Sequence, residues 1–136
     1  KQEKLKIDSM VNLDTLGVDG TYSWKNNSTK SLLEMVKRVA AEAKLGLTEV
    51  SFWGGDADSS SFRKLGIPAI TLFGASEAVI WDVIHGVGDC LKSFSLPDYK
   101  NTYLLTIALL NKLDAQPVRP LERLARFAAN IVRGLF

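Results

Sequence analysis

Apolar and polar positions along the chain predict three strands. Residues 5–13 alternate between apolar and polar in their first half, which predicts a central strand with Asp14 at its end. Residues 67–73 are apolar except at Thr71 and indicate a strand that is buried on both faces of a sheet. A third, short strand is predicted at residues 50–53, just before two glycines.

Apolar residues elsewhere recur at the spacing of helices. Four segments show this pattern or lie between residues that start and end helices: Ser28 or Thr29 to Gly46, residues 59–65, Asp98 or Asn101 to Leu113, and residues 121–135. The helix ending at Leu113 is apolar on most sides, so we expect it to be buried. Residues 17–27 predict a loop or hairpin, and residues 75–88 predict a loop.

The order of these elements predicts the fold class. Strands and helices alternate, so we expect an α/β fold with a layered, largely parallel β-sheet flanked by helices. The one candidate linker is the segment 114–120, which contains two prolines. We therefore expect one domain at residues 1–116 and an appended amphipathic helix at residues 117–136.

Composition excludes several classes of protein. The 136 residues suffice for one domain with a core, and a net charge of +2 without basic runs gives no reason to expect a nucleic-acid partner. A single cysteine excludes an internal disulfide framework, and no stretch reaches the roughly 18 apolar residues of a membrane span. The chain starts with Lys1 rather than Met and runs at once into a strand pattern, so we expect a processed product or an excised part of a longer protein.

Asp14 and His85 are the first candidates for chemistry. Ligands of open α/β sheets bind outside the carboxyl ends of the strands, and both residues follow strand patterns or the loops after them. A carboxylate and an imidazole at one crevice would form half of a metal site. The alternatives are that Asp14 is a turn or cap residue and that His85, the only histidine, is a surface or core residue.

A second group of candidates lies in the loop after the short strand. Asp56 and Asp58 could serve acid–base chemistry, bind a cation or orient a substrate amine. Equally, Asp58 or Ser59 could cap the short helix that follows. A catalytic pair of Cys90 with His85 is a weaker alternative, and the serines at 59–61 do not form a G-x-S-x-G elbow.

The last predicted helix is basic on one side. Its arginines are opposed by apolar residues, and such a helix can lie on an anionic membrane, dock on a partner or pack on the core of its own domain. Packing on the domain itself is the interpretation we favour. The two faces consist of Arg119, Arg123, Arg126 and Arg133, and of Leu124, Phe127, Ala128, Ile131 and Leu135.

Taken in order, three segments resemble the motifs of a known family. They are Asn12-Leu13-Asp14, then Asp58 to Phe62 followed by Gly66-Ile67-Pro68-Ala69, and finally His85 to Asp89. With the long helix near residues 101–113, they resemble the C-terminal half of an M28-family zinc aminopeptidase, whose fold the glutaminyl cyclases share. The resemblance covers about residues 5–114. It implies a partial phosphorylase/hydrolase-like zinc-peptidase fold.

The resemblance also implies roles for individual residues. Asp14 would ligate one zinc of a pair and His85 the other, while Asp58 and Ser59 would lie beside the N-terminus of a peptide substrate. The family's general base and remaining ligands would come before Lys1, so no catalytic residue is expected in this chain. Two zinc ions are expected in the complete domain, and this chain alone is expected to be inactive.

Departures from the family pattern leave alternatives open. Ser59, Ile84 and Gly86 stand where the family has His, Tyr and Thr. The chain could therefore belong to a non-catalytic, peptidase-like binding module, or to a glutaminyl cyclase that needs one zinc. Expected partners are a peptide N-terminus and either the missing N-terminal half or a second copy at an open sheet edge. The resemblance slightly favours a secreted or extracytoplasmic protein.

Overall fold

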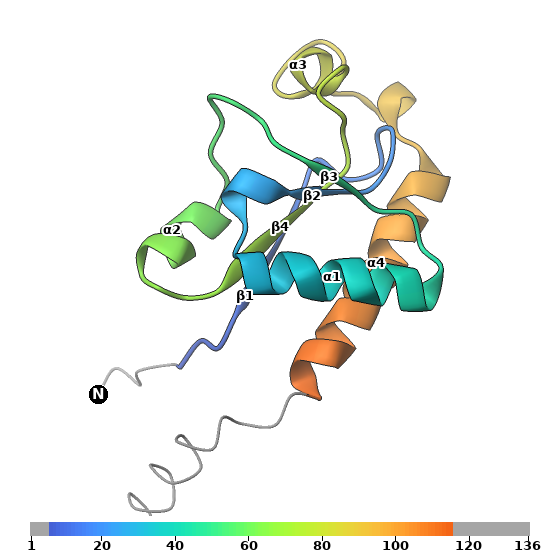
Figure 1. Ribbon diagram of the computed structural model, residues 1–136. Helices are drawn as coiled ribbons and strands as arrows, with labels where there is room; N and C mark the ends of the chain where they lie inside the picture. Colours follow the sequence, from blue (N-terminus) through green and yellow to red (C-terminus); the bar gives the residue numbers. More distant parts are fainter. Residues whose placement is uncertain (1–5, 116–136) are drawn as a thin grey trace, which may run out of the picture.

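The computed structural model describes residues 6–115, and these residues form an α/β fold (Figure 1). The strands of its mixed, mostly parallel sheet are β1 (Met10–Asp14), β2 (Tyr22–Trp24), β3 (Thr48–Val50) and β4 (Ala69–Phe73). The helices are α1 (Lys30–Ala43), α2 (Ser59–Lys64), α3 (Ile80–Val83) and α4 (Leu96–Asp114), with 3₁₀ turns η1 (Lys25–Asn27) and η2 (Leu91–Ser93). The predicted helix 121–135 and the domain boundary after residue 116 lie outside the described residues.

The sheet has the strand order β1-β4-β2-β3. β1 pairs in parallel with β4, and β2 in parallel with β3, whereas β2 and β4 run antiparallel. All five residues of β4 are buried, which confirms the prediction of a strand covered on both faces. Within residues 6–115, β1 is an edge strand with β4 as its one neighbour, which agrees with the open sheet edge expected for this chain; a central position in a complete domain stays a prediction.

Helices α1 and α4 cover one face of the sheet, and Figure 1 shows α1 crossing in front of the strands. Their apolar sides meet Ile70 and Leu72 of β4, whose side chains point to this face. Every second residue of β4 points to this face, and these residues pack against the apolar stripes of both helices. The helical residues buried in this cluster are Leu32, Leu33, Met35, Val36, Val39 and Ala40 of α1, and Leu105 and Leu109 of α4.

An aromatic cluster covers the opposite face. The rings of Trp24, Phe52 and Phe73 lie with centroids 5.1–5.7 Å apart in tilted and edge-to-face arrangements. Such geometry is favoured because the positive edge of one ring meets the negative face of another. Ile80 of α3 completes this cluster, so α3 is held at the sheet by apolar contact.

Several boundaries differ from the sequence prediction. Residues 22–24, inside the segment predicted as a loop or hairpin, form a strand that pairs with β3 and β4. The short strand predicted at 50–53 lies at 48–50, and residues 80–83 form a helical turn within a predicted loop. These three-residue and four-residue elements are too short to show periodicity. Helix α2 is confirmed, ending before Gly66 as predicted.

The helix ends also differ. Ser95 caps α4, since its hydroxyl accepts a hydrogen bond from the Asp98 amide, so neither Asp98 nor Asn101 is the cap. At the other long helix, Thr29 is the N-cap residue, but its hydroxyl accepts from the Ala69 amide of β4. Helix α1 ends at Ala43, and its C-cap residue is Lys44, in a left-handed conformation, rather than Gly46. The Thr29 hydroxyl, which the local sequence suggests as a helix cap, is thus used for a tertiary hydrogen bond to β4 instead.

Candidate functional site

The carboxyl ends of β1 and β4 lie side by side, as the parallel register pairs Asp14 with Phe73. Beyond the strand ends, the segments that follow β1 and β4 stay in contact: a Cβ atom on Gly74 would lie only 2.4 Å from the Thr15 carbonyl oxygen. The Gly74 carbonyl accepts hydrogen bonds from the amides of Val18 and Asp19. Glycine at position 74 thus allows the loops after β1 and β4 to touch.

Asp19 fastens these two loops together. Its carboxylate accepts hydrogen bonds from the Ser76 amide at 2.7 Å and from the Ser76 hydroxyl at 2.5 Å. Sequence reasoning missed Asp19, because its partner is 57 residues away and neither residue belongs to a motif. Through these two hydrogen bonds the exposed Asp19 side chain holds the loop after β1 against the loop after β4.

His85 follows α3 and is exposed, with a left-handed backbone conformation at φ 56°. The glycines beside it are required by the turn itself. A Cβ atom on Gly88 would lie 2.4 Å from the Asp82 carbonyl oxygen, to which the Gly88 amide donates a hydrogen bond. The structure therefore explains this Gly-rich segment as a tight return of the chain after α3.

A cavity of about 130 Å³ lies between the segment after β1 and the segment that contains His85. Figure 1 shows α3 and the start of α4 at this end of the molecule, opposite the end where β1 begins. Thr15, the neighbour of Asp14, and Asp89, in the His85 segment, both line the cavity, whereas Asp14 and His85 do not. The other lining residues are Leu16, Gly17, Val18, Val83, Cys90, Ser93 and Phe94.

Asp14 itself is half-buried at the end of β1, and its carboxylate accepts a 2.8 Å hydrogen bond from the Thr15 hydroxyl. Within residues 6–115 no three side chains of His, Cys, Asp or Glu gather in a group that could hold a metal ion. Zinc sites in proteins use three or four such ligands. Asp14 and His85 therefore do not complete a zinc site with other described residues.

Cys90 is the second candidate that borders this cavity. It is exposed and unbonded to another cysteine, and its sulfur lies 4.0 Å from the Ser93 hydroxyl. The Ser93 hydroxyl itself donates to the Gly88 carbonyl at 2.6 Å, which ties the turn after α3 to η2. Within residues 6–115 the structure shows no hydrogen bond between Cys90 and His85, so a catalytic pair of these two residues stays a prediction from their spacing.

Asp58 and Ser59, the predicted substrate-binding residues, differ in their environments. Asp58 is exposed at the start of α2 and makes no side-chain capping hydrogen bond. Ser59 is fully buried, and its hydroxyl donates to the Asn27 backbone carbonyl at 2.9 Å and lies 2.7 Å from the Thr71 hydroxyl. The structure thus gives Ser59 a role in packing α2 against the sheet.

Asp56 rather than Asp58 joins the polar network around Ser59. Asn27 accepts hydrogen bonds through its Oδ1 atom from the hydroxyls of Ser59 and Ser60, at 3.1 and 2.6 Å. The Ser60 hydroxyl also contacts the Asp56 carboxylate. This contact and the hydrogen bond from the Ala57 amide hold the pKa of Asp56 below its ordinary value, because both stabilise the charged form.

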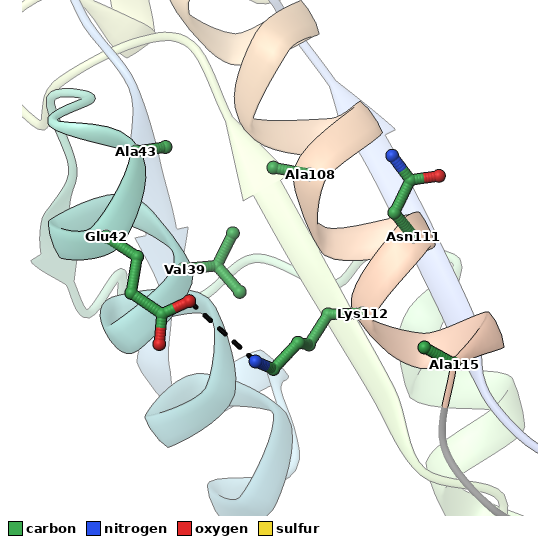
Figure 2. Close-up of a pocket in the computed structure, with 7 residues that line it drawn as sticks. All are labelled: Val39, Glu42, Ala43, Ala108, Asn111, Lys112 and Ala115. Atoms are coloured by element: carbon green, nitrogen blue, oxygen red, sulfur yellow. Dashed lines mark ion pairs between the residues drawn. The ribbon is translucent and has the colours of Figure 1, made fainter.

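A larger groove lies on the other side of the molecule, between α1 and α4. Figure 2 shows Val39 and Glu42 of α1 pointing toward α4, with a dashed ion pair between Glu42 and Lys112. The groove holds about 390 Å³, and the charged atoms of this pair are 3.7 Å apart. None of the residues singled out from the sequence lines it, and both partners of the pair are largely exposed.

Comparison with known protein families, with curated proteins and with solved structures finds no match to this chain. Among the helices within residues 6–115, none has both the length and the apolar character needed to cross a membrane. The geometry described above is therefore the basis for any functional proposal.

Proposed function

We propose that this chain is the C-terminal portion of a zinc-dependent, aminopeptidase-like hydrolase that releases N-terminal residues from peptides. In this proposal Asp14 and His85 each ligate one of two zinc ions, and Asp58 lies beside the substrate amine. The chain is incomplete on its own, and further residues of the longer protein supply the general base and the other ligands.

The observation that carries the proposal is the convergence of two segments at the carboxyl ends of parallel strands. Asp14 ends β1, and the segment containing His85 and Asp89 returns to border the same cavity as Thr15. Ligand sites of α/β proteins form at such ends. The motif order in the sequence supports the same interpretation.

The open edge at β1 also supports the proposal. Among residues 6–115, one side of β1 has no partner strand, and Leu13 on this strand is 45% exposed. A sheet edge of this kind needs a neighbour or some other cover. A preceding part of a larger α/β domain would meet that need and would bring additional ligands to the Asp14 end of the sheet.

The described residues do not form a zinc site without those additional ligands, so no catalytic step is assigned to them. When bound, a pair of zinc ions would activate a water molecule for attack on the peptide carbonyl. The contribution of this chain would be a carboxylate at the end of β1 and an imidazole just after α3. Gly74 and Asp19 hold the loop after β1 against the loop after β4, which leads into α3.

The test is the zinc content and aminopeptidase activity of the protein expressed from its complete reading frame. We expect about two zinc ions per chain, by the two-metal logic of such hydrolases. Asp14→Ala and His85→Ala should each lose bound zinc and activity on aminoacyl substrates. Asp82→Asn is the matched control, because Asp82 is an exposed carboxylate of α3 and should leave both unchanged.

No bound zinc, or zinc and activity that survive both substitutions, would refute the proposal. Circular dichroism of each variant shows whether a loss reflects unfolding instead. Product analysis on a peptide with N-terminal glutamine separates a cyclase from a peptidase, because cyclisation releases ammonia and leaves the peptide chain intact.

A second candidate function is a peptidase-like binding module without catalysis. The observation that favours it is Ser59, which stands where the family resemblance expects His and is buried with its hydroxyl bonded to protein atoms. A side chain in this state cannot contact substrate. Zinc-dependent turnover by the complete protein would exclude this candidate.

A further inference from the structure

Helix α4 carries an apolar stripe on its outer side. Its members recur every three or four residues, so they share one face of the helix, and each is at least 39% exposed. They are Leu96 (65%), Tyr99 (39%), Tyr103 (53%), Ile107 (42%) and Leu110 (45%).

This outer stripe is distinct from the side of α4 that packs on the domain. The buried residues of α4 are Thr102, Leu105, Thr106 and Leu109, and the groove toward α1 is lined by Ala108 and Lys112, among others. The ring of Tyr99 packs against that of Phe94, and the rest of the outer stripe is left largely exposed by the residues that the structure describes. Contiguous exposed apolar surface of this kind marks a contact with another element or molecule.

The sequence after α4 contains a matching stripe. Along α4 the stripe residues Tyr99, Tyr103, Ile107 and Leu110 are spaced by four, four and three positions. In the predicted helix 121–135, apolar residues are spaced by three, four and four positions, which is the mirror image of that pattern. Two antiparallel helices bring residues together in reversed order, so mirrored spacing keeps both stripes in one register. The residues of the second stripe are Leu124, Phe127, Ile131 and Leu135.

The connection between the two segments has the length of a helix–helix turn. Six residues, 115–120, separate the end of α4 from Leu121, and two of them are proline. Helices joined by about two to eight residues usually pack as antiparallel neighbours. Proline at position 120 also suits the start of a helix, since its missing N–H needs no partner there.

We propose that residues 121–135 form a helix that folds back antiparallel on α4 and covers its outer stripe. The pairs Leu110–Leu124, Ile107–Phe127, Tyr103–Ile131 and Tyr99–Leu135 then meet in one register. Arg126 and Arg133 lie on the side opposite these apolar residues and face water. This contact is independent of the proposed hydrolase function, because it involves neither Asp14 nor His85.

Disulfide trapping in the full 136-residue chain tests this contact. In a Cys90→Ser background, which removes the only native thiol, Tyr103→Cys is combined with Ile131→Cys. Mild oxidation should give an intramolecular disulfide in most of the protein, identified by peptide mass mapping. The matched control pairs Asn111→Cys, on the groove side of α4, with Ile131→Cys and should remain reduced.

A second variant tests the same contact without cysteines. Ile107→Asp places a charge in the middle of the stripe, and amide hydrogen exchange in residues 121–135 should rise at least tenfold, whereas Asn111→Asp should leave it unchanged. Equal trapping of both cysteine pairs, or of neither, would overturn the proposal. Disulfides between chains would identify a second copy as the occupant, and protection of 121–135 that requires phosphatidylserine-containing vesicles would identify a membrane surface.

Discussion

The hydroxyl oxygens of Ser59 and Thr71 lie 2.7 Å apart, and both side chains are fully buried. This contact joins the first residue of α2 to the middle of β4. Thr71 also receives a 3.5 Å hydrogen bond from the amide group of Asn12, so the contact links α2 to the edge strand β1 as well. Ser59, Thr71 and Asn12 are thus bonded to one another rather than isolated, as burial favours.

Ser59→Ala should destabilise the protein by about 1–3 kcal/mol, because it leaves buried hydrogen-bonding groups of Asn27 and Thr71 with a lost partner. The free energy of unfolding from denaturant titration measures the effect. Ser61→Ala is the control, since Ser61 is exposed on the same helix, and it should change stability by less than about 0.5 kcal/mol. Equal effects of the two substitutions would show that the network does not contribute to stability.

Glu49 gives the fold a dependence on pH. Its carboxylate lies 2.6 Å from the Lys37 ammonium and 3.1 Å from the Lys25 ammonium, joining β3 to α1 and to η1. The hydrogen bond from Lys37, followed by that from Lys25, holds the pKa of Glu49 below its ordinary value. A lowered pKa in the folded state means that the stabilisation is complete above the unfolded-state pKa and is lost as pH falls through the folded-state pKa.

Glu49→Gln should therefore lower Tm by a few degrees at neutral pH, as is typical when an ion pair at the surface is removed. The difference from wild type should shrink once pH falls below the ordinary glutamate pKa of about 4.3, and it should vanish below the lowered pKa of the native Glu49 carboxyl. Thermal unfolding followed by circular dichroism across this range provides the measurement. Glu34→Gln, also near Lys37 but more exposed, is the control and should show a smaller difference. A difference that stays constant as pH falls below the ordinary glutamate pKa would contradict the ion-pair explanation.

Within the part of the chain that the structure describes, one edge of β1 is open, and it should promote association of the chain with itself. Unpaired N–H and C=O groups along an edge strand can pair with another strand, and charged residues on the edge suppress such pairing. We expect the average molar mass from light scattering to rise above that of a monomer with concentration. Leu13→Lys should reduce the rise, whereas Leu65→Lys, at an exposed apolar site outside the sheet, should not. A wild-type chain that stays monomeric at high concentration would refute this expectation.

The elements that sequence patterns predicted well are those with long or unbroken apolar patterns. β4 reads as a continuous apolar run because helices and the aromatic cluster cover both of its faces. α1 shows a clear helical stripe because one side packs on the sheet and the other faces water. β2, by contrast, has three residues and no detectable period, and it forms because Tyr22 and Ser23 pair with β4 residues about fifty positions away.

The candidate site was predictable only in its location. Parallel pairing of β1 with β4 puts Asp14 beside the loop after β4, as expected for residues at strand ends. The sequence could not show whether Asp56 or Asp58 joins the polar network around Ser59. The position of α2 on the sheet decides this, because it brings the Ser60 hydroxyl to the Asp56 carboxylate. Asp19 and its bond to Ser76 gave no sequence signal, since loop contacts follow no period.

By itself, the sequence determined the α/β class, the buried strand β4 and the helical periodicity of α1 and α4, because the alternation of apolar and polar residues reflects which side of each element faces water. Tertiary structure alone decided the strand order and the antiparallel pairing of β2 with β4. It also decided that Ser59 is buried in a polar network rather than available to a ligand. These features depend on pairing and packing between residues far apart in the chain, and the local pattern around each residue carries no information about its distant partner.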